Sequence, residues 1–208
     1  MIKILNRATW KLAAITIILA GNLCVIAAPK IQGDIEPKVA EAIVLFRNGQ
    51  IQKAIAQFRE IGDPAVPAAR ELLQTDVGSR GMPQLLLSGF IASTEGVRAN
   101  VALVELLSDG SPYLRGVAAS SIGKRKLKAA VPQLISLLND KEVYLTTHVT
   151  HPNGYDREPS GIDVPTLVRD AAIDALQLIT GKKLARSGSR EKQAKAWLQW
   201  WQKQKARK

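Results

Sequence analysis

Apolar residues recur at helical spacing along most of the chain, and the clearest run lies within residues 100–140. The sequence Leu-Leu-Ser-Asp at 106–109 returns as Leu-Leu-Asn-Asp at 137–140, a spacing of 31 residues. Before each Leu-Leu pair, apolar residues three or four positions apart mark one face of an α-helix. A fixed period of this length is typical of stacked helical hairpins.

A second helix follows the first in each unit. Residues 114–122 carry apolar side chains at helical spacing, and we expect this helix to end at Gly123, because glycine readily takes the left-handed conformation of a helix end. Residues 167–180 show the same design and precede another glycine. Arg169 in this later helix matches Arg115 in the earlier one, which favours repeats over an ordinary helical bundle.

These segments resemble bacterial HEAT-like repeats. The resemblance is carried by GDPAVPAARELL, AAVPQLISLLND and VRDAAIDALQLITG, which lie within residues 62–181. It implies an all-α fold, a right-handed α-solenoid of HEAT-like helical hairpins, and it says little about function. Residues 36–61 form a further predicted helical hairpin whose Gly, Ala-Ile and Phe spacing is similar to a tetratricopeptide repeat. A lone repeat cannot bury its own face, so we interpret this hairpin as the amino-terminal cap of the array.

The period is broken once. Asp109 and Arg115 lie 6 positions apart, but the matching Asp140 and Arg169 lie 29 apart, which indicates an insertion of 23 residues. Residues 143–164 begin with a run rich in β-branched side chains and contain a Pro-Asn-Gly turn signal. We therefore predict a β-hairpin-like insertion between the two helices of the last unit.

The insertion carries both histidines of the protein, His148 and His151, and Tyr155 lies close to them. Side chains alternate along a strand, so two positions three apart point to opposite faces. No cysteine or third histidine follows residue 27 to complete a zinc set. We expect neither a metal nor catalysis here, but a polar recognition loop, because insertions in repeat arrays often lie on the binding face.

Residues 1–27 have the pattern of a secretory signal peptide, with positive residues, an apolar run and small residues at a cleavage site. The apolar run is short for a membrane span of about 20 residues, although an uncleaved anchor is the alternative. Cleavage would remove Cys24, the single cysteine, and would leave no thiol or disulfide chemistry. Residues 28–35 are a predicted linker, and we expect the protein to be periplasmic or extracellular.

Positive charge is concentrated at the carboxyl end. The whole chain has a net charge of +11, but residues 182–208 hold 10 basic residues and one acidic residue, whereas residues 29–181 hold 16 and 17. A nearly neutral array disfavours nucleic acid as a partner. The tail favours an anionic membrane surface or envelope polymer instead. The candidate residues for that contact are Lys203, Lys205, Arg207 and Lys208.

Residues 191–203 of the tail predict a helix with tryptophan on one face. Trp197 and Trp201 fall four positions apart on this face, and Trp200 lies just off it. We expect the helix to cap the array by packing against a helix at 165–180, since repeat arrays need a terminal cap. Trp200 is the ring that we expect to be exposed.

No constellation of residues looks catalytic, and no cofactor or metal is expected. The leading hypothesis is a non-enzymatic protein-interaction or scaffold module that binds a protein or peptide in a groove lined by the second helices. Its candidate residues are Arg115, Ser120, Arg169 and Asp174. Arg115 and Arg169 have a second interpretation, in which they bond neighbouring repeats together. The basic cluster at 124–128 is interpreted as a solvated loop.

Two other functions come from different classes. One is a tether to the envelope surface that acts through the basic tail. The other is a phycobilin lyase-like or chaperone activity, because cytoplasmic phycobilin lyases contain similar repeats. The predicted export of the chain argues against this last hypothesis.

Overall fold

The computed structural model describes residues 35–75, 77–150, 161–185 and 188–206. The predicted signal peptide therefore lies outside the described residues, as does nearly all of the predicted linker. The described chain is mostly helical and includes one two-stranded sheet, which confirms the all-α prediction. Its α-helices are α1 (Ile35–Arg47), α2 (Ile51–Ile61), α3 (Val66–Leu72), α4 (Gly81–Ser93), α5 (Val97–Leu106), α6 (Pro112–Arg125), α7 (Val131–Ser136), α8 (Val168–Thr180) and α9 (Arg190–Lys205).

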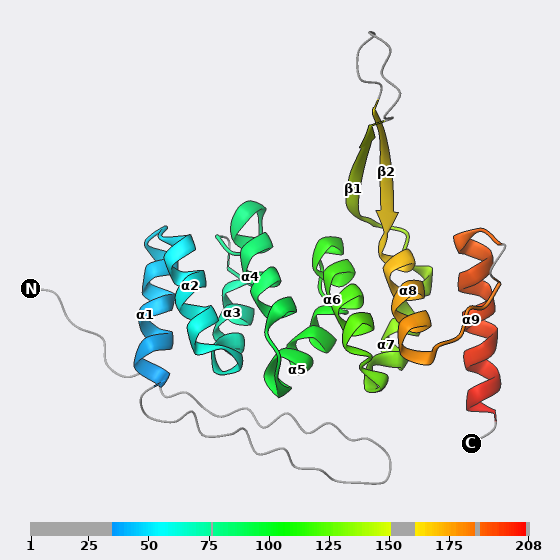
Figure 1. Cartoon of the computed structure of the whole chain (residues 1–208), viewed down its shortest axis with the longest axis horizontal. Coiled ribbons are helices and arrows are strands. Elements are labelled where there is room, and N and C mark those ends of the chain that lie inside the picture. Colours follow the sequence, from blue (N-terminus) through cyan, green and yellow to red (C-terminus); the bar gives the residue numbers. More distant parts are fainter. Residues whose placement is uncertain (1–34, 76, 151–160, 186–187, 207–208) are drawn as a thin grey trace, which may run out of the picture.

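Figure 1 shows the helices standing side by side in a row that follows the sequence, with α1 at one end and α9 at the other. The packing follows the same order: α1 packs on α2, α5 on α6, and α8 on both α6 and α9. Short 3₁₀ helices precede α3 and α7 and follow α7, and they are η1 (Asp63–Ala65), η2 (Lys128–Ala130) and η3 (Leu137–Asn139). One apolar core runs along the whole row.

Two aspartates make matching bonds at matching turns. One carboxylate oxygen of Asp109 accepts a hydrogen bond at 3.0 Å from the backbone amide two residues later, and Asp140 does the same at 3.0 Å. The other oxygen of Asp109 lies 3.7 Å from the Arg70 guanidinium, and that of Asp140 accepts a 2.8 Å bond from Arg115. The bonds within the two turns therefore repeat with the 31-residue period, whereas the arginine partners differ: Arg70 lies on α3 and Arg115 on α6.

Helix α6 does not end at Gly123 as predicted. It continues to Arg125, and Lys126 takes the left-handed conformation, with a φ of 54°. A Cβ atom at Gly123 would lie 2.6 Å from the Cα atom of Ala175 on α8. The glycine is therefore needed for the close approach of α6 and α8, and not for a helix end.

The predicted hairpin is present as β1 (Val143–Thr150) and β2 (Gly161–Leu167), which pair antiparallel. Figure 1 shows it projecting from the row of helices. Its base is closed, because Val143 pairs with Leu167 and the Arg169 amide donates a 3.0 Å bond to the carbonyl oxygen of Asp140. The returning strand is longer than predicted, so the last helix begins at Val168 and not at residue 165.

The base of the hairpin rests on α6. The ring of Tyr144 lies against Gly116, where a Cβ atom would meet ring carbons at 2.2 Å. Tyr144 is half-buried, while Val143 and Leu145 on either side of it are 47% exposed. The base of the hairpin is thus held by the Tyr144 ring on α6 as well as by the backbone bonds.

At the other end, α9 packs against α7, η3 and α8. Trp197 is fully buried, and Trp200 stands edge-on to it with 5.2 Å between ring centroids. Trp200 and Trp201 are both half-buried, with 6.2 Å between their ring centroids. The prediction of an exposed Trp200 is therefore wrong: its ring is held between its two neighbours, because consecutive tryptophans at the end of an array can pack on each other as well as on the core.

Candidate functional site

Arg115 was predicted either to line a binding groove or to bond neighbouring repeats together, and it is 9% exposed with its guanidinium used inside the protein. Its Nε donates to Asp140 at 2.8 Å, and its Nη1 donates to the backbone oxygens of Asp109 and Gly110 at 2.8 and 3.1 Å. Its Nη2 donates to the carboxylate of Glu142. Burial alone would lower the pKa of Arg115, but the bonds to the two carboxylates outweigh it and raise the pKa. The residue ties α6 to the turn before the hairpin.

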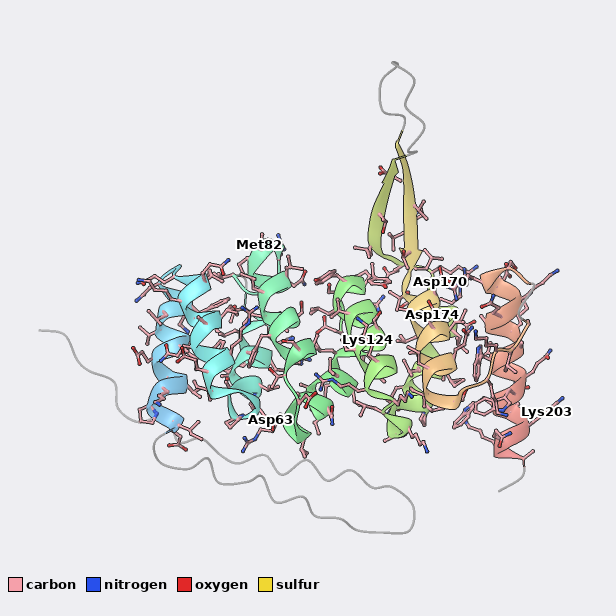
Figure 2. The ribbon with its side chains drawn as sticks, in the orientation of Figure 1. Asp63, Met82, Lys124, Asp170, Asp174 and Lys203 are labelled. Atoms are coloured by element: carbon pink, nitrogen blue, oxygen red, sulfur yellow. The ribbon has the colours of Figure 1, made fainter. Side chains whose placement is uncertain are left out.

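The other three predicted groove residues do not gather into one site with Arg115. Arg169 is mostly buried, with its Nε 3.5 Å from the neighbouring Asp170 carboxylate. Asp174 accepts two bonds from Arg190 of α9, at 2.6 and 3.1 Å, so it fastens the last helix to α8. Ser120 lies half-buried on α6. Figure 2 shows Asp170 and Asp174 on α8 near α9.

The predicted recognition loop can be placed only in part. The backbone of His148 pairs with that of Asp163 within the sheet. His151 and Tyr155 lie outside the described residues. Across the residues that the structure describes, no three His, Cys, Asp or Glu side chains come together as a metal site would require.

Two polar contacts were not foreseen from the sequence. Arg125, within the basic cluster predicted to be a solvated loop, donates to the backbone oxygens of Ala92 and Thr94 at the end of α4, at 2.8 and 2.6 Å. Burial lowers its pKa, although Glu95 and Asp63 act in the opposite direction. Asp63 accepts a 2.8 Å bond from the amide of Ala99 and so caps the start of α5.

The exposed side chains of the second helices include large apolar residues. Met82 and Leu85 on α4 are 59% and 47% exposed, and Leu178 on α8 is 48% exposed. Figure 2 shows Met82 at the upper end of α4. Their signal in the sequence was available, because each of these large apolar residues lies off the buried stripe of its helix.

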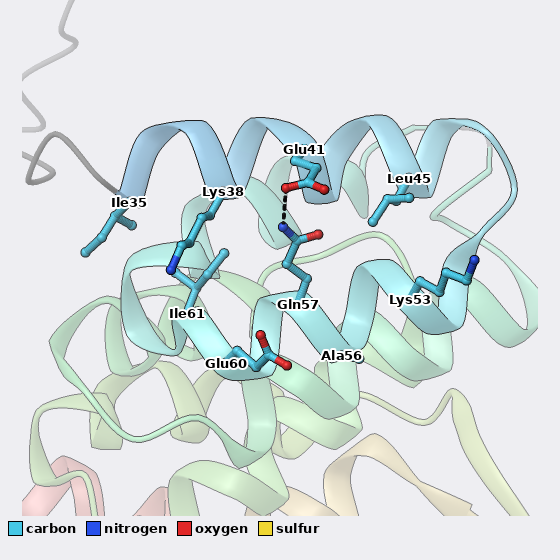
Figure 3. A pocket seen from close by; sticks show the side chains of 9 residues that line it. All are labelled: Ile35, Lys38, Glu41, Leu45, Lys53, Ala56, Gln57, Glu60 and Ile61. Carbon is cyan, nitrogen blue, oxygen red and sulfur yellow. Dashed lines mark hydrogen bonds between the residues drawn. The ribbon is translucent and has the colours of Figure 1, made fainter.

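A hollow of about 570 Å³ lies between α1 and α2, at the end of the row away from the tail (Figure 3). Its walls combine apolar Ile35 and Ile61 with Lys38, Lys53 and Glu60. Across it, the amide of Gln57 donates a 2.9 Å hydrogen bond to Glu41. Because both signs of charge line it and it is shallow, the hollow shows no preference for one class of ligand.

The candidate residues of the tail are exposed where they are described. Lys203 and Lys205 lie in the last turn of α9, and the Nζ of Lys205 is 5.8 Å from the ring centroid of Trp201. Arg207 and Lys208 lie outside the described residues. Among the helices that the structure describes, none has both the length and the apolar character of a membrane span.

Comparisons with protein-family models, with curated proteins and with solved structures gave no match to this chain.

Proposed function

We propose that this protein is a non-enzymatic interaction or scaffold module of the cell envelope, built as a right-handed α-solenoid of HEAT-like hairpins. Helices packed in sequence order support the solenoid. So do the matching bonds of Asp109 and Asp140, because each hairpin of a solenoid contacts only its neighbours. The signal-peptide pattern of residues 1–27 supports export.

The partner is a protein or peptide that lies across the second helices α4, α6 and α8. One observation carries this proposal: Arg115 and Asp174 on these helices are used in internal bonds, while the large apolar Leu85 and Leu178 stay exposed. Apolar contacts therefore provide the affinity, and the half-buried Ser120 on α6 is a further candidate contact. A surface that internal bonds hold rigid loses little conformational entropy on binding. Because it exposes large apolar side chains, it suits a partner with an apolar face.

Capture of the partner from the native envelope by chemical cross-linking tests this proposal. The full-length chain is compared with Leu85→Glu and Leu178→Glu, each of which puts a charge on the proposed surface. Val101→Glu is the matched control, because Val101 is 43% exposed on α5, a first helix. We expect a discrete adduct with the wild type and the control, and its loss with the two other variants. An adduct lost only with the control would place the partner on the opposite face.

A further inference from the structure

Helices α6, α8 and α9 end at one edge of the molecule, where α4 also ends against Arg125. Arg115 near the start of α6 bonds to residues just before the hairpin that leads into α8, and Gly123 near its end lies against Ala175 of α8. These two contacts show that α6 and α8 run in the same direction. Figure 1 shows α9 running the same way as α8 and ending at the lower edge of the row.

That edge carries lysine from three separate stretches of sequence. The last turn of α6 and the turn after it supply three, the stretch following α8 supplies two, and the last turn of α9 supplies two. The seven exposed lysines, called the basic edge below, are Lys124, Lys126, Lys128, Lys182, Lys183, Lys203 and Lys205. Figure 2 shows Lys124 and Lys203 on the lower half of their helices.

The negative ends of the helix dipoles balance only part of this positive charge. A cation at a helix carboxyl end is favourable, and three such ends meet at the basic edge. Each end presents only about half a negative charge. Glu95 and Asp63 lie near Arg125 at the same edge and offset part of the remaining positive charge. In the described part of the chain, none of these lysines has its Nζ within 4.0 Å of a carboxylate oxygen. No acidic residue occurs in 123–130, 181–185 or 202–206.

The breadth of the basic edge determines what kind of anion fits it. Neighbouring helices lie about 8–10 Å apart, so a charge row that spans three helices covers roughly 20 Å and suits an extended surface. Lysine carries a point charge on a long stem, without the fork that arginine uses to grip a single phosphate. A surface with many phosphate groups therefore fits better than one small anion.

Two aromatic rings favour a lipid surface over a dissolved polymer. Trp200 and Trp201 are only half-buried, near the end of α9 that contributes Lys203 and Lys205. Tryptophan is enriched at membrane interfaces, where its apolar body and its polar N–H are both accommodated. A dissolved polyanion would use the lysines alone.

We propose that the basic edge docks on an anionic phospholipid bilayer, with the helices standing end-on to the membrane surface. The lysines of α6 and of the stretch after α8 take part along with the tail. This orientation leaves the outer sides of α4, α6 and α8 free for the partner proposed above. The inference does not rest on that partner, because the lysines of the basic edge are not among its proposed contacts.

Sedimentation with vesicles of phosphatidylglycerol and phosphatidylcholine, against phosphatidylcholine alone, tests the proposal on the full chain. The decisive variant is Lys124→Gln/Lys126→Gln/Lys128→Gln, which leaves the tail intact. We expect about 100-fold weaker binding to the anionic vesicles, from roughly fivefold for each lysine that reaches the surface. Added salt weakens binding of the wild type by screening the same charges.

Arg47→Gln/Lys53→Gln/Arg80→Gln removes the same charge from the opposite edge, at the end of α1 and the starts of α2 and α4, and we expect it to bind as the wild type does. Thermal melts establish that both triple variants are folded. Contact between Trp200 and lipid is measured by fluorescence quenching with brominated lipid. The part of the quenching that comes from Trp200 is the difference between the wild type and Trp200→Phe. Equal losses in the two triple variants would overturn the proposal, because binding would then follow net charge alone. Tight binding to soluble polyphosphate, with no quenching of Trp200 by lipid, would overturn it in favour of a polyanionic polymer.

Discussion

Adding one methyl group at Gly123 tests the close contact between α6 and α8. In Gly123→Ala the new Cβ atom would lie 2.6 Å from the Cα atom and 2.9 Å from the Cβ atom of Ala175, where 3.4–4 Å is ordinary contact. Both atoms belong to the α8 backbone or are fixed to it, so no side chain can rotate out of the way. The helices α6 and α8 must move apart, and the loss of packing follows.

A second glycine provides the matched control. Gly89 lies inside α4, and a Cβ atom there would meet nothing within 4 Å. Alanine is favoured over glycine within a helix by about 1 kcal/mol, and both substitutions gain this term. Comparing the two variants therefore isolates the cost of overpacking, which is about 1–3 kcal/mol.

Urea denaturation followed by circular dichroism measures the free energy of unfolding of the wild type and both variants. We expect Gly89→Ala to be more stable than the wild type, and Gly123→Ala to be less stable than Gly89→Ala by about 1–3 kcal/mol. The slope of the transition should be unchanged, because the surface exposed on unfolding is nearly the same. Equal stability of the two variants would refute the close approach of α6 and α8.

Further predictions follow from burial and capping. Leu137→Ala should cost about 2–5 kcal/mol in urea denaturation, and replacing residues 146–165 with an Asn-Gly turn should cost far less; comparable losses would show that the hairpin belongs to the core. Asp63→Ala should lower stability by about 1 kcal/mol through loss of the cap on α5, and Asp63→Asn should retain most of it. Trp197→Ala should cost about 3–5 kcal/mol in the absence of any ligand, which a thermal melt can measure. Mass spectrometry of the protein from its native host should find an amino terminus near Ala28, and a chain that begins at Met1 would show an uncleaved anchor.

The helices and the hairpin could be predicted because their signals are local. Apolar side chains at helical spacing predict a helix wherever they occur, and residues 143–150 are β-branched enough to predict a strand. The end of α6 was missed because glycine serves two purposes. It suits a left-handed helix end as well as a close helix contact, and only the position of Ala175 separates the two at Gly123.

The roles of the arginines depend on partners that lie far away in the sequence. The match between Arg115 and Arg169 therefore wrongly suggested that the two residues have equivalent roles. Arg115 bonds to Asp140, which lies 25 residues further along the chain. Among the described residues the Arg169 guanidinium bonds only to the neighbouring Asp170, and the single helix α9 follows α8 in place of another hairpin. Arg125 looked like part of a solvated basic loop, but it lies against the backbone oxygens at the end of α4. Nothing in its local sequence indicates that contact.

Site-specific photo-cross-linking in the native host tests the proposed function most directly. A photoreactive side chain is placed at Leu85 or Leu178 on the second helices, or at Val97 or Val101 on α5, all of which are exposed. The proposal predicts an adduct of one discrete mass at Leu85 and Leu178 and little at the two valines. Equal adducts at all four positions, or adducts concentrated at the valines, would contradict a partner that lies across α4, α6 and α8.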